Sequence, residues 1–244
     1  MAEKKVTREV QEPKELSFFE KNVKEFLIVI LAVVVVIGII TYFVKAKEEK
    51  TKSIEYKYSK LLEEFRKKEI NIYNWQKELK NQKILEDELK KFEKFADKYS
   101  GTAFGKEALF MSAKLYYIKK DYDKAYKLFK KYKNMADNEL EEARALFAIG
   151  KIYETKAFNG QKELYNDAIS MYEKMIKKYK DFKPFYWEAL LTMGNCYMAQ
   201  DKLDKAQECY KKILKEENNK NKDIAFFVEA HRKLDKINKM KKIK

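Results

Sequence analysis

The chain has 244 residues, among them 54 Lys or Arg, 39 Asp or Glu, one His, two Pro and six Gly. A single His excludes a cluster of imidazoles for zinc, and so few Gly and Pro exclude a sheet protein with many turns. The composition, 38% charged and 45% apolar, is typical of long amphipathic helices. We therefore expect an all-α protein. It has no Gly-rich phosphate loop, H-E-x-x-H or C-x-x-C motif, so we predict no enzyme, catalytic residue, cofactor or metal.

The positive charge is unevenly distributed along the chain. Residues 1–44 contain equal numbers of basic and acidic side chains, so the net charge of +15 lies in residues 45–244. A charge of this sign attracts anionic lipid or nucleic acid. The lysines are spread along the sequence, however, which favours solvated helix faces. We therefore do not expect a nucleic-acid partner.

Residues 26–44 are uncharged and strongly apolar. At about 1.5 Å per residue they nearly cross the hydrocarbon core of a bilayer as a helix. The run is too long for the core of a signal peptide, so we predict an uncleaved, single-pass transmembrane helix. Residues 1–25 form a polar tail, in which an apolar stripe over 16–26 predicts an interfacial helix. Basic residues are balanced on both sides of the span, so the positive-inside rule leaves the orientation open.

Beyond the span, residues 45–244 show weak self-similarity with a period of about 34 residues. A final helix should cap the stack of repeats. The segments are, in chain order, a degenerate repeat at 52–101, repeats at 106–139, 143–182 and 187–220, and a capping helix at 223–241. The middle repeat fits only with six inserted residues, 157–162. They would place Phe158 either at an exposed loop tip or folded back onto the repeat.

Small residues recur at the eighth and twentieth places of the repeats, where two helices would touch. These packing residues are Ala113, Ala125, Gly150, Ala168, Gly194 and Ala206. An aromatic residue follows at the twenty-fourth place. This pattern resembles the tetratricopeptide repeat. The resemblance implies that each repeat is a pair of antiparallel helices and that the aromatic residues fill the space beside the small ones. The glycines Gly101, Gly105 and Gly160 are predicted in turns.

The resemblance to the tetratricopeptide repeat implies a superhelix whose concave groove is lined by the first helix of each repeat. The candidate groove residues are Phe110, Lys114, Tyr117, Phe147, Lys151, Leu191, Asn195 and Met198. Phe110, Phe147 and Leu191 share one place in successive repeats, and Lys114 and Lys151 lie one helical turn further on. This arrangement favours binding of an apolar protein segment with acidic neighbours. The alternative is that the apolar side chains belong to the core.

A closer resemblance, to the YfgM-like family of ancillary Sec-translocon subunits, is carried by residues 18–22, 58–62 and 95–102. It implies a protein of the cytoplasmic (inner) membrane with a cytoplasmic N-terminus and extracytoplasmic repeats. Its implied partners are translocon subunits and nascent or assembling envelope proteins. The alternatives are a scaffold for an envelope assembly, such as division or secretion machinery, and a cytoplasm-facing nucleic-acid or ribosome binder.

Three further side chains have candidate chemistry. Cys196 and Cys209 fall on the two helices of the last repeat. We expect buried thiols, and the alternative is an oxidised pair if the domain lies outside the cytoplasm. His231 lies in the predicted capping helix, where a surface or interface role is expected.

Overall fold

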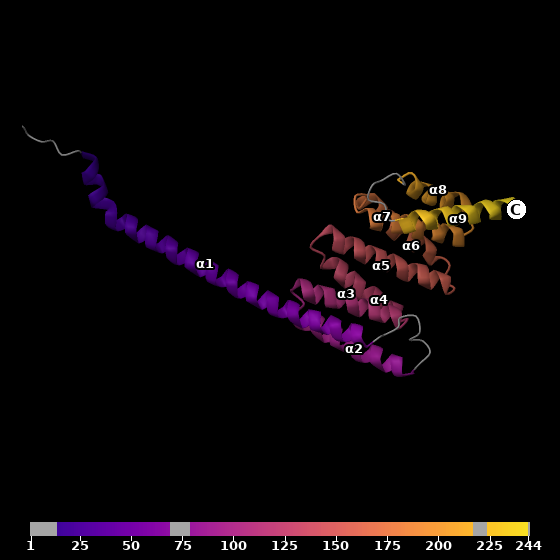
Figure 1. Cartoon of the computed structure of the whole chain (residues 1–244), viewed down its shortest axis with the longest axis horizontal. Coiled ribbons are helices and arrows are strands. Elements are labelled where there is room, and N and C mark those ends of the chain that lie inside the picture. Colours follow the sequence, from indigo (N-terminus) through magenta and orange to yellow (C-terminus); the bar gives the residue numbers. More distant parts are fainter. Residues whose placement is uncertain (1–13, 69–78, 217–223, 244) are drawn as a thin grey trace, which may run out of the picture. The chain divides into compact units, whose positions relative to one another are not determined.

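The computed structural model describes residues 14–68, 79–216 and 224–243. These residues form helices and contain no strand, which confirms the all-α prediction (Figure 1). The helices are α1 (Lys14–Lys67), α2 (Leu79–Lys98), α3 (Ala103–Ile118), α4 (Tyr122–Asn134), α5 (Glu139–Phe158), α6 (Leu164–Lys178), α7 (Lys183–Ala199), α8 (Leu203–Leu214) and α9 (Ile224–Ile243).

The chain divides into two units, residues 1–56 and 57–244. The first unit contains most of helix α1. An apolar window of 18 residues in this helix has a mean hydropathy of 3.2, and 0% of it is buried. By length and composition the helix is a candidate membrane span. Residues 1–13 of the predicted polar tail lie outside the described part of the chain, and the helix already begins at Lys14.

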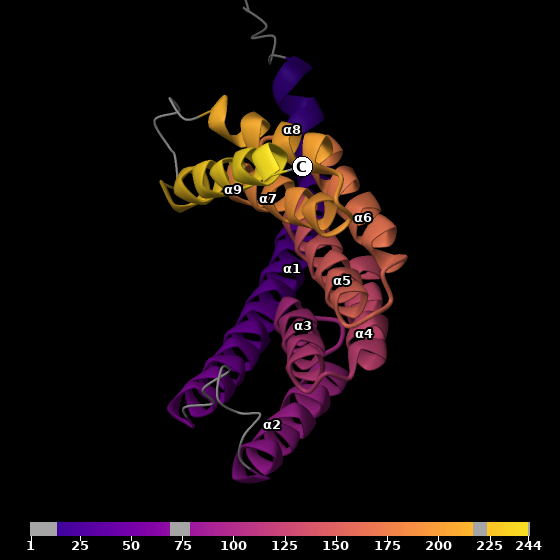
Figure 2. The same cartoon turned by 90° about the vertical axis from the view of Figure 1, so that its right-hand side faces the viewer.

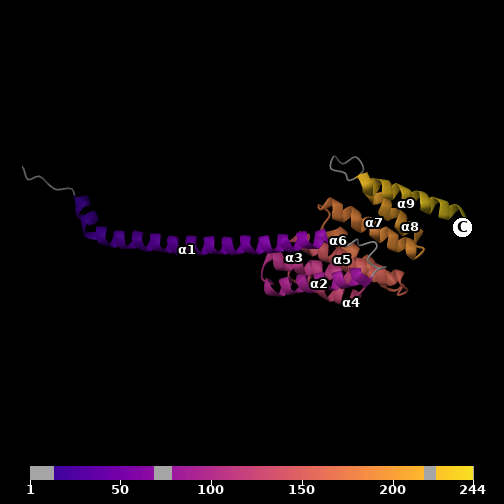
Figure 3. The same cartoon turned by 60° about the horizontal axis from the view of Figure 1, so that its bottom comes forward.

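The second unit is a stack in which each helix from α2 to α9 packs against the next. Figure 2 shows α3, α5 and α7 along the inner side of the curved stack, and α4 and α6 along its outer side. The rotated view in Figure 3 shows α9 lying along α8 at the end of the stack. This arrangement confirms the predicted superhelix of helical repeats.

Small side chains allow the paired helices to approach closely. Ala125, Ala168 and Ala206 are fully buried, as is Ala113. A Cβ atom added to Gly150 would lie 2.6 Å from a ring carbon of Tyr172. The equivalent atom at Gly194 would also lie 2.6 Å from the ring of a buried tyrosine, Tyr210. The two glycines therefore provide the space that the aromatic rings occupy.

Two local predictions are wrong. Gly105 does not lie in a connecting loop but in the first helical turn of α3. A Cβ added there would lie 1.9 Å from the carbonyl oxygen of Tyr99. Helix α3 begins here because the hydroxyl of the N-cap Thr102 accepts a hydrogen bond from the Gly105 N–H at 3.0 Å. Phe158 is not at a loop tip, because α5 continues to this residue, although its side chain is 81% exposed. Gly160 follows in a turn with φ +123°.

Ion pairs join successive repeats. The buried Lys106 ammonium of α3 lies 2.6 Å from a carboxylate oxygen of Asp137 and 2.7 Å from one of Glu141. Burial raises the pKa of Glu141, but the Lys106 ammonium and the Asp137 backbone N–H lower it more, so the net shift is downward. The ionised carboxylate therefore stabilises the contact between α3 and the start of α5.

The two cysteines are buried free thiols, as predicted. Burial raises the pKa of Cys196, and likewise that of Cys209, to about 12. Both thiols therefore stay protonated near neutral pH and are poor nucleophiles.

Candidate functional site

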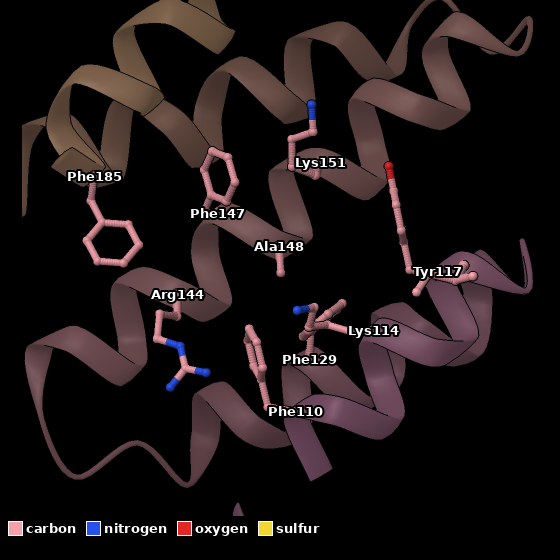
Figure 4. Close-up of a pocket in the computed structure, with 10 residues that line it drawn as sticks. Phe110, Lys114, Tyr117, Phe129, Arg144, Phe147, Ala148, Lys151 and Phe185 are labelled. Carbon is pink, nitrogen blue, oxygen red and sulfur yellow. The ribbon is translucent and has the colours of Figure 1, made fainter. Parts of the chain in front are cut away.

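A cavity of about 510 Å³ lies on the inner side of the stack, between α3, α5 and α7 (Figure 4). Its walls are mostly apolar, with three basic side chains among them. The residues that line it are Phe110, Lys114, Tyr117, Ile118, Phe129, Arg144, Phe147, Ala148, Lys151 and Phe185. A concave apolar cavity with a few polar groups is the usual form of a binding site.

Helical spacing brings these side chains onto one face of each helix. On α3, Phe110, Lys114 and Tyr117 lie four and then three residues apart, and on α5 Phe147 and Lys151 lie four apart. Residues at these spacings share one face of a helix. Each helix therefore presents an aromatic side chain followed, one turn later, by a lysine.

The aromatic side chains have a second role in the core. The Phe110 ring centroid lies 5.2 Å from that of Phe129 and 4.9 Å from that of Tyr132. The Phe147 centroid lies 5.9 Å from that of the buried Tyr172. Both phenylalanines remain partly exposed while they make these contacts. They therefore form the wall between the core and the cavity, with one side packed against the core and the other facing the cavity.

Arg144 is held in place by its own partners. Its two terminal nitrogens lie 2.6 and 3.0 Å from the two carboxylate oxygens of Glu107. The guanidinium also lies over the ring of Phe110, 4.2 Å from the centroid. Such a two-point pair fixes the side chain and neutralises its charge. Arg144 thus shapes the cavity wall and joins α5 to α3.

The two cavity lysines differ in their partners. Lys114 is exposed, and within the part of the chain that the structure describes no carboxylate lies within 4.0 Å of its ammonium. The Lys151 ammonium lies 2.8 Å from Glu154 on the same helix. Burial lowers the pKa of Lys151, but Glu154 more than offsets this effect, so the pKa lies above its usual value. Lys114 is therefore the cation that a bound acidic group can contact most readily.

A second, more polar cavity of about 350 Å³ adjoins the first and shares Lys151 with it. Its other lining residues are Glu154, Thr155, Phe158, Tyr165, Asn195 and Ala199. The Tyr117 hydroxyl lies 2.7 Å from the hydroxyl of Thr155. This contact joins α3 to α5 where the two cavities meet.

The structure places six of the eight predicted groove residues in these cavities. Five line the first cavity, and Asn195 lines the second. Leu191 packs against the core, and the Met198 sulfur accepts the Tyr210 hydroxyl at 3.3 Å, so neither lines these two cavities.

Sequence reasoning missed two important wall residues. Arg144 occupies the second place of its repeat, a groove position, so its place in the repeat could have identified it. Phe185 lies in the first turn of α7. It was missed because the predicted repeat begins only at residue 187. In the described residues no group of three or more His, Cys, Asp or Glu side chains is arranged to hold a metal ion.

Comparison with solved structures gives distant similarities. The crystal structure of MamA is similar with 19% identity and a TM-score of 0.41, over 66% of this chain and 94% of that chain. A monomeric IFIT1 mutant with m7Gppp-AAAA is 19% identical, with a TM-score of 0.41, over 64% of this chain and 38% of that one. A monomeric IFIT1 mutant with Gppp-AAAA is 20% identical, with a TM-score of 0.41, over 67% and 42%.

No curated protein matches the chain in sequence. A sequence model of the tetratricopeptide repeat-like domain matches residues 16–239, which is most of the chain. The helical stack and the buried small residues described above agree with this match. The chain belongs to the family of tetratricopeptide repeat-like domains.

Proposed function

We propose that this protein is a membrane-anchored module that captures apolar segments of other proteins in its inner groove. The observation that carries the proposal is the first cavity, in which aromatic side chains from α3, α5 and α7 surround a space of about 510 Å³ beside the exposed Lys114. Tetratricopeptide repeats are protein-interaction scaffolds, and solenoids bind partners on their concave surfaces.

The cavity is large enough for more than one apolar side chain of a partner segment. Full burial of a Leu or Phe side chain contributes about 1.5–3 kcal/mol. An acidic residue next to it would contact Lys114, and an exposed ion pair of this kind contributes about 0.2–1 kcal/mol. Binding should therefore depend mainly on apolar contact, with charge adding selectivity and salt dependence.

The apolar part of α1, residues 26–44, would tether this groove to a membrane. A tether raises the effective concentration of the groove near membrane-bound partners without any new contact. The resemblance to the YfgM-like family supports a role as an accessory or chaperone-like factor at the bacterial translocon. The partners would then be translocon subunits and nascent or assembling envelope proteins, with the N-terminus cytoplasmic and the repeats outside.

Labelling of a single cysteine tests the tether and its orientation. Ser53→Cys, in a Cys196→Ser and Cys209→Ser background, places one thiol at an exposed position after the apolar stretch. A thiol reagent that cannot cross membranes should label intact cells. Labelling only after lysis would show that the orientation is opposite to the one proposed. Recovery of the chain in the soluble fraction would contradict a membrane anchor.

Groove capture is tested with variants of the cavity wall, each of which is first checked for wild-type helix content by circular dichroism. Phe147→Ala removes one aromatic wall, and Lys114→Glu reverses the exposed cation. Leu140→Ala is a matched control on α5, because this side chain is 43% exposed and does not line the cavity. Phe147→Ala and Lys114→Glu should each weaken capture of membrane-protein segments, the latter mainly at low salt. Equal capture by all variants would contradict a binding role for the cavity.

A further inference from the structure

The excess positive charge of the repeats lies on the outer helices. In the inner helices α3, α5 and α7, six basic residues balance six acidic residues. The outer helices α4, α6 and α8 instead carry eleven lysines and five acidic residues, and α4 alone has five lysines and one Asp. The outer helices therefore carry a net charge of +6, which is part of the +15 of the whole chain, on the side of the stack opposite the groove.

This outer charge converges on a hollow of about 480 Å³. Helix α4 contributes Lys133, and the last two turns of α6 contribute Lys174, Lys177 and Lys178. Glu142 and the buried Leu146 of α5 complete the lining. The hollow is thus lined by four ammonium groups and one carboxylate, with an apolar side chain among them.

Among the residues that the structure describes, one of the four lysines has a carboxylate partner within 4.0 Å. The Lys178 ammonium lies 2.6 Å from Glu142 and holds the pKa of that carboxyl below its usual value. Around Lys133, Lys174 and Lys177, no carboxylate of the described residues lies within 4.0 Å. Like charges that line one hollow repel each other, and an anion placed between them relieves that repulsion. Lysines near helix C-termini also interact favourably with the helix dipole, but this effect does not require them to line one hollow.

We propose that this hollow, together with the neighbouring lysines of α4, binds the phosphate groups of anionic lipids. The chain has an apolar helix of membrane-spanning length. A bilayer that contains anionic lipids is therefore the polyanionic surface that the repeats would meet first. Lysines close to an anionic bilayer are attracted to it. No aromatic side chain of the described residues lines the hollow, so it offers no ring on which a base could stack, which disfavours single-stranded nucleic acid.

The test uses the full chain, held by its apolar helix in nanodiscs of phosphatidylcholine. Vesicles of phosphatidylcholine with or without phosphatidylglycerol are added, and co-flotation of the chain is measured. The hollow variant is Lys133→Gln, Lys174→Gln and Lys177→Gln. Its matched control is Lys83→Gln, Lys90→Gln and Lys94→Gln, which removes the same charge from exposed positions of α2. Circular dichroism is used to check that both variants fold.

The wild-type chain should bind only the anionic vesicles. Each lysine contributes about fivefold to binding of an anionic surface, so the hollow variant should bind about 100-fold more weakly. The control should lose much less. Equal losses in the two variants, or no preference of the wild type for phosphatidylglycerol, would overturn the proposal. The proposal would also be overturned if the hollow variant bound vesicles as well as the wild type but lost binding to duplex nucleic acid. The groove is intact in both variants, so this result is independent of the proposed protein capture.

Discussion

Replacement of Gly194 by alanine tests whether the glycine is required by packing. On an open helix face, Gly→Ala stabilises a helix by about 1 kcal/mol. Here the new Cβ would lie 2.6 Å from ring carbon Cε1 of Tyr210 and 2.8 Å from Cζ. The ring cannot move aside easily, because it is fully buried and its hydroxyl donates to Asn195 at 2.9 Å. The steric effect therefore opposes the propensity effect.

The steric effect and the propensity effect on the free energy of unfolding can be estimated separately. Overpacking of a core costs about 1–3 kcal/mol, so Gly194→Ala should destabilise the chain by about 0–2 kcal/mol after the gain in propensity. In a Tyr210→Leu background the ring is absent. The same substitution should then be neutral or stabilising, by up to about 1 kcal/mol. The double-mutant cycle should give a coupling of about 1–3 kcal/mol.

Urea unfolding of the full chain in detergent micelles measures these differences. Far-UV circular dichroism reports the loss of helix, and fluorescence of Trp187, which is buried on α7, reports the last repeat. Gly101→Ala is the control, because nothing lies within 4 Å of its added Cβ. The packing argument would be refuted if Gly194→Ala stabilised the wild-type chain by about 1 kcal/mol, or if the coupling were near zero.

Three further outcomes follow from the geometry. Gly105→Ala should destabilise the chain by more than about 3 kcal/mol in urea unfolding, since its Cβ would collide with a backbone oxygen at 1.9 Å; a mild effect would contradict the turn geometry. The pKa of Glu141 is lowered in the folded chain, so its stabilising contribution is complete above its unfolded value of 4.5 and is lost as the pH falls below it; Lys106→Met should flatten this acid limb of the stability curve. Cys196 and Cys209 should react with a thiol reagent only after denaturation, and stoichiometric labelling of the native chain at pH 8 would contradict their burial.

Repeat periodicity predicted the arrangement of the helices well, because it depends on small residues at fixed spacing. Gly150 and Gly194 have a defined place in the repeat, and each lies against the tyrosine that shares its repeat. The same periodicity placed Phe110 and Phe147 on neighbouring helices, where both line one cavity. These relations could be predicted because each residue has a fixed place in the repeat once the six inserted residues of the middle repeat are set aside.

Other features depend on local contacts that periodicity does not describe. Gly105 was predicted in a turn, yet the N-cap Thr102 starts helix α3 before it. Met198 occupies a groove place in its repeat, but its sulfur accepts a hydrogen bond from the hydroxyl of Tyr210. The uneven distribution of charge between inner and outer helices became visible only when each helix had been assigned to a layer.

Photo-crosslinking in cells tests most directly whether the inner groove captures other proteins. A photoreactive side chain at position 147 or at the exposed position 114 would face the first cavity, and one at the exposed Lys127 on the outer helix α4 serves as the control. We expect crosslinks to membrane or envelope proteins from positions 147 and 114, which the Phe185→Ala variant should reduce, and few from position 127. Equal yields at the inner and outer positions, with no effect of Phe185→Ala, would show that the cavity does not bind partner segments.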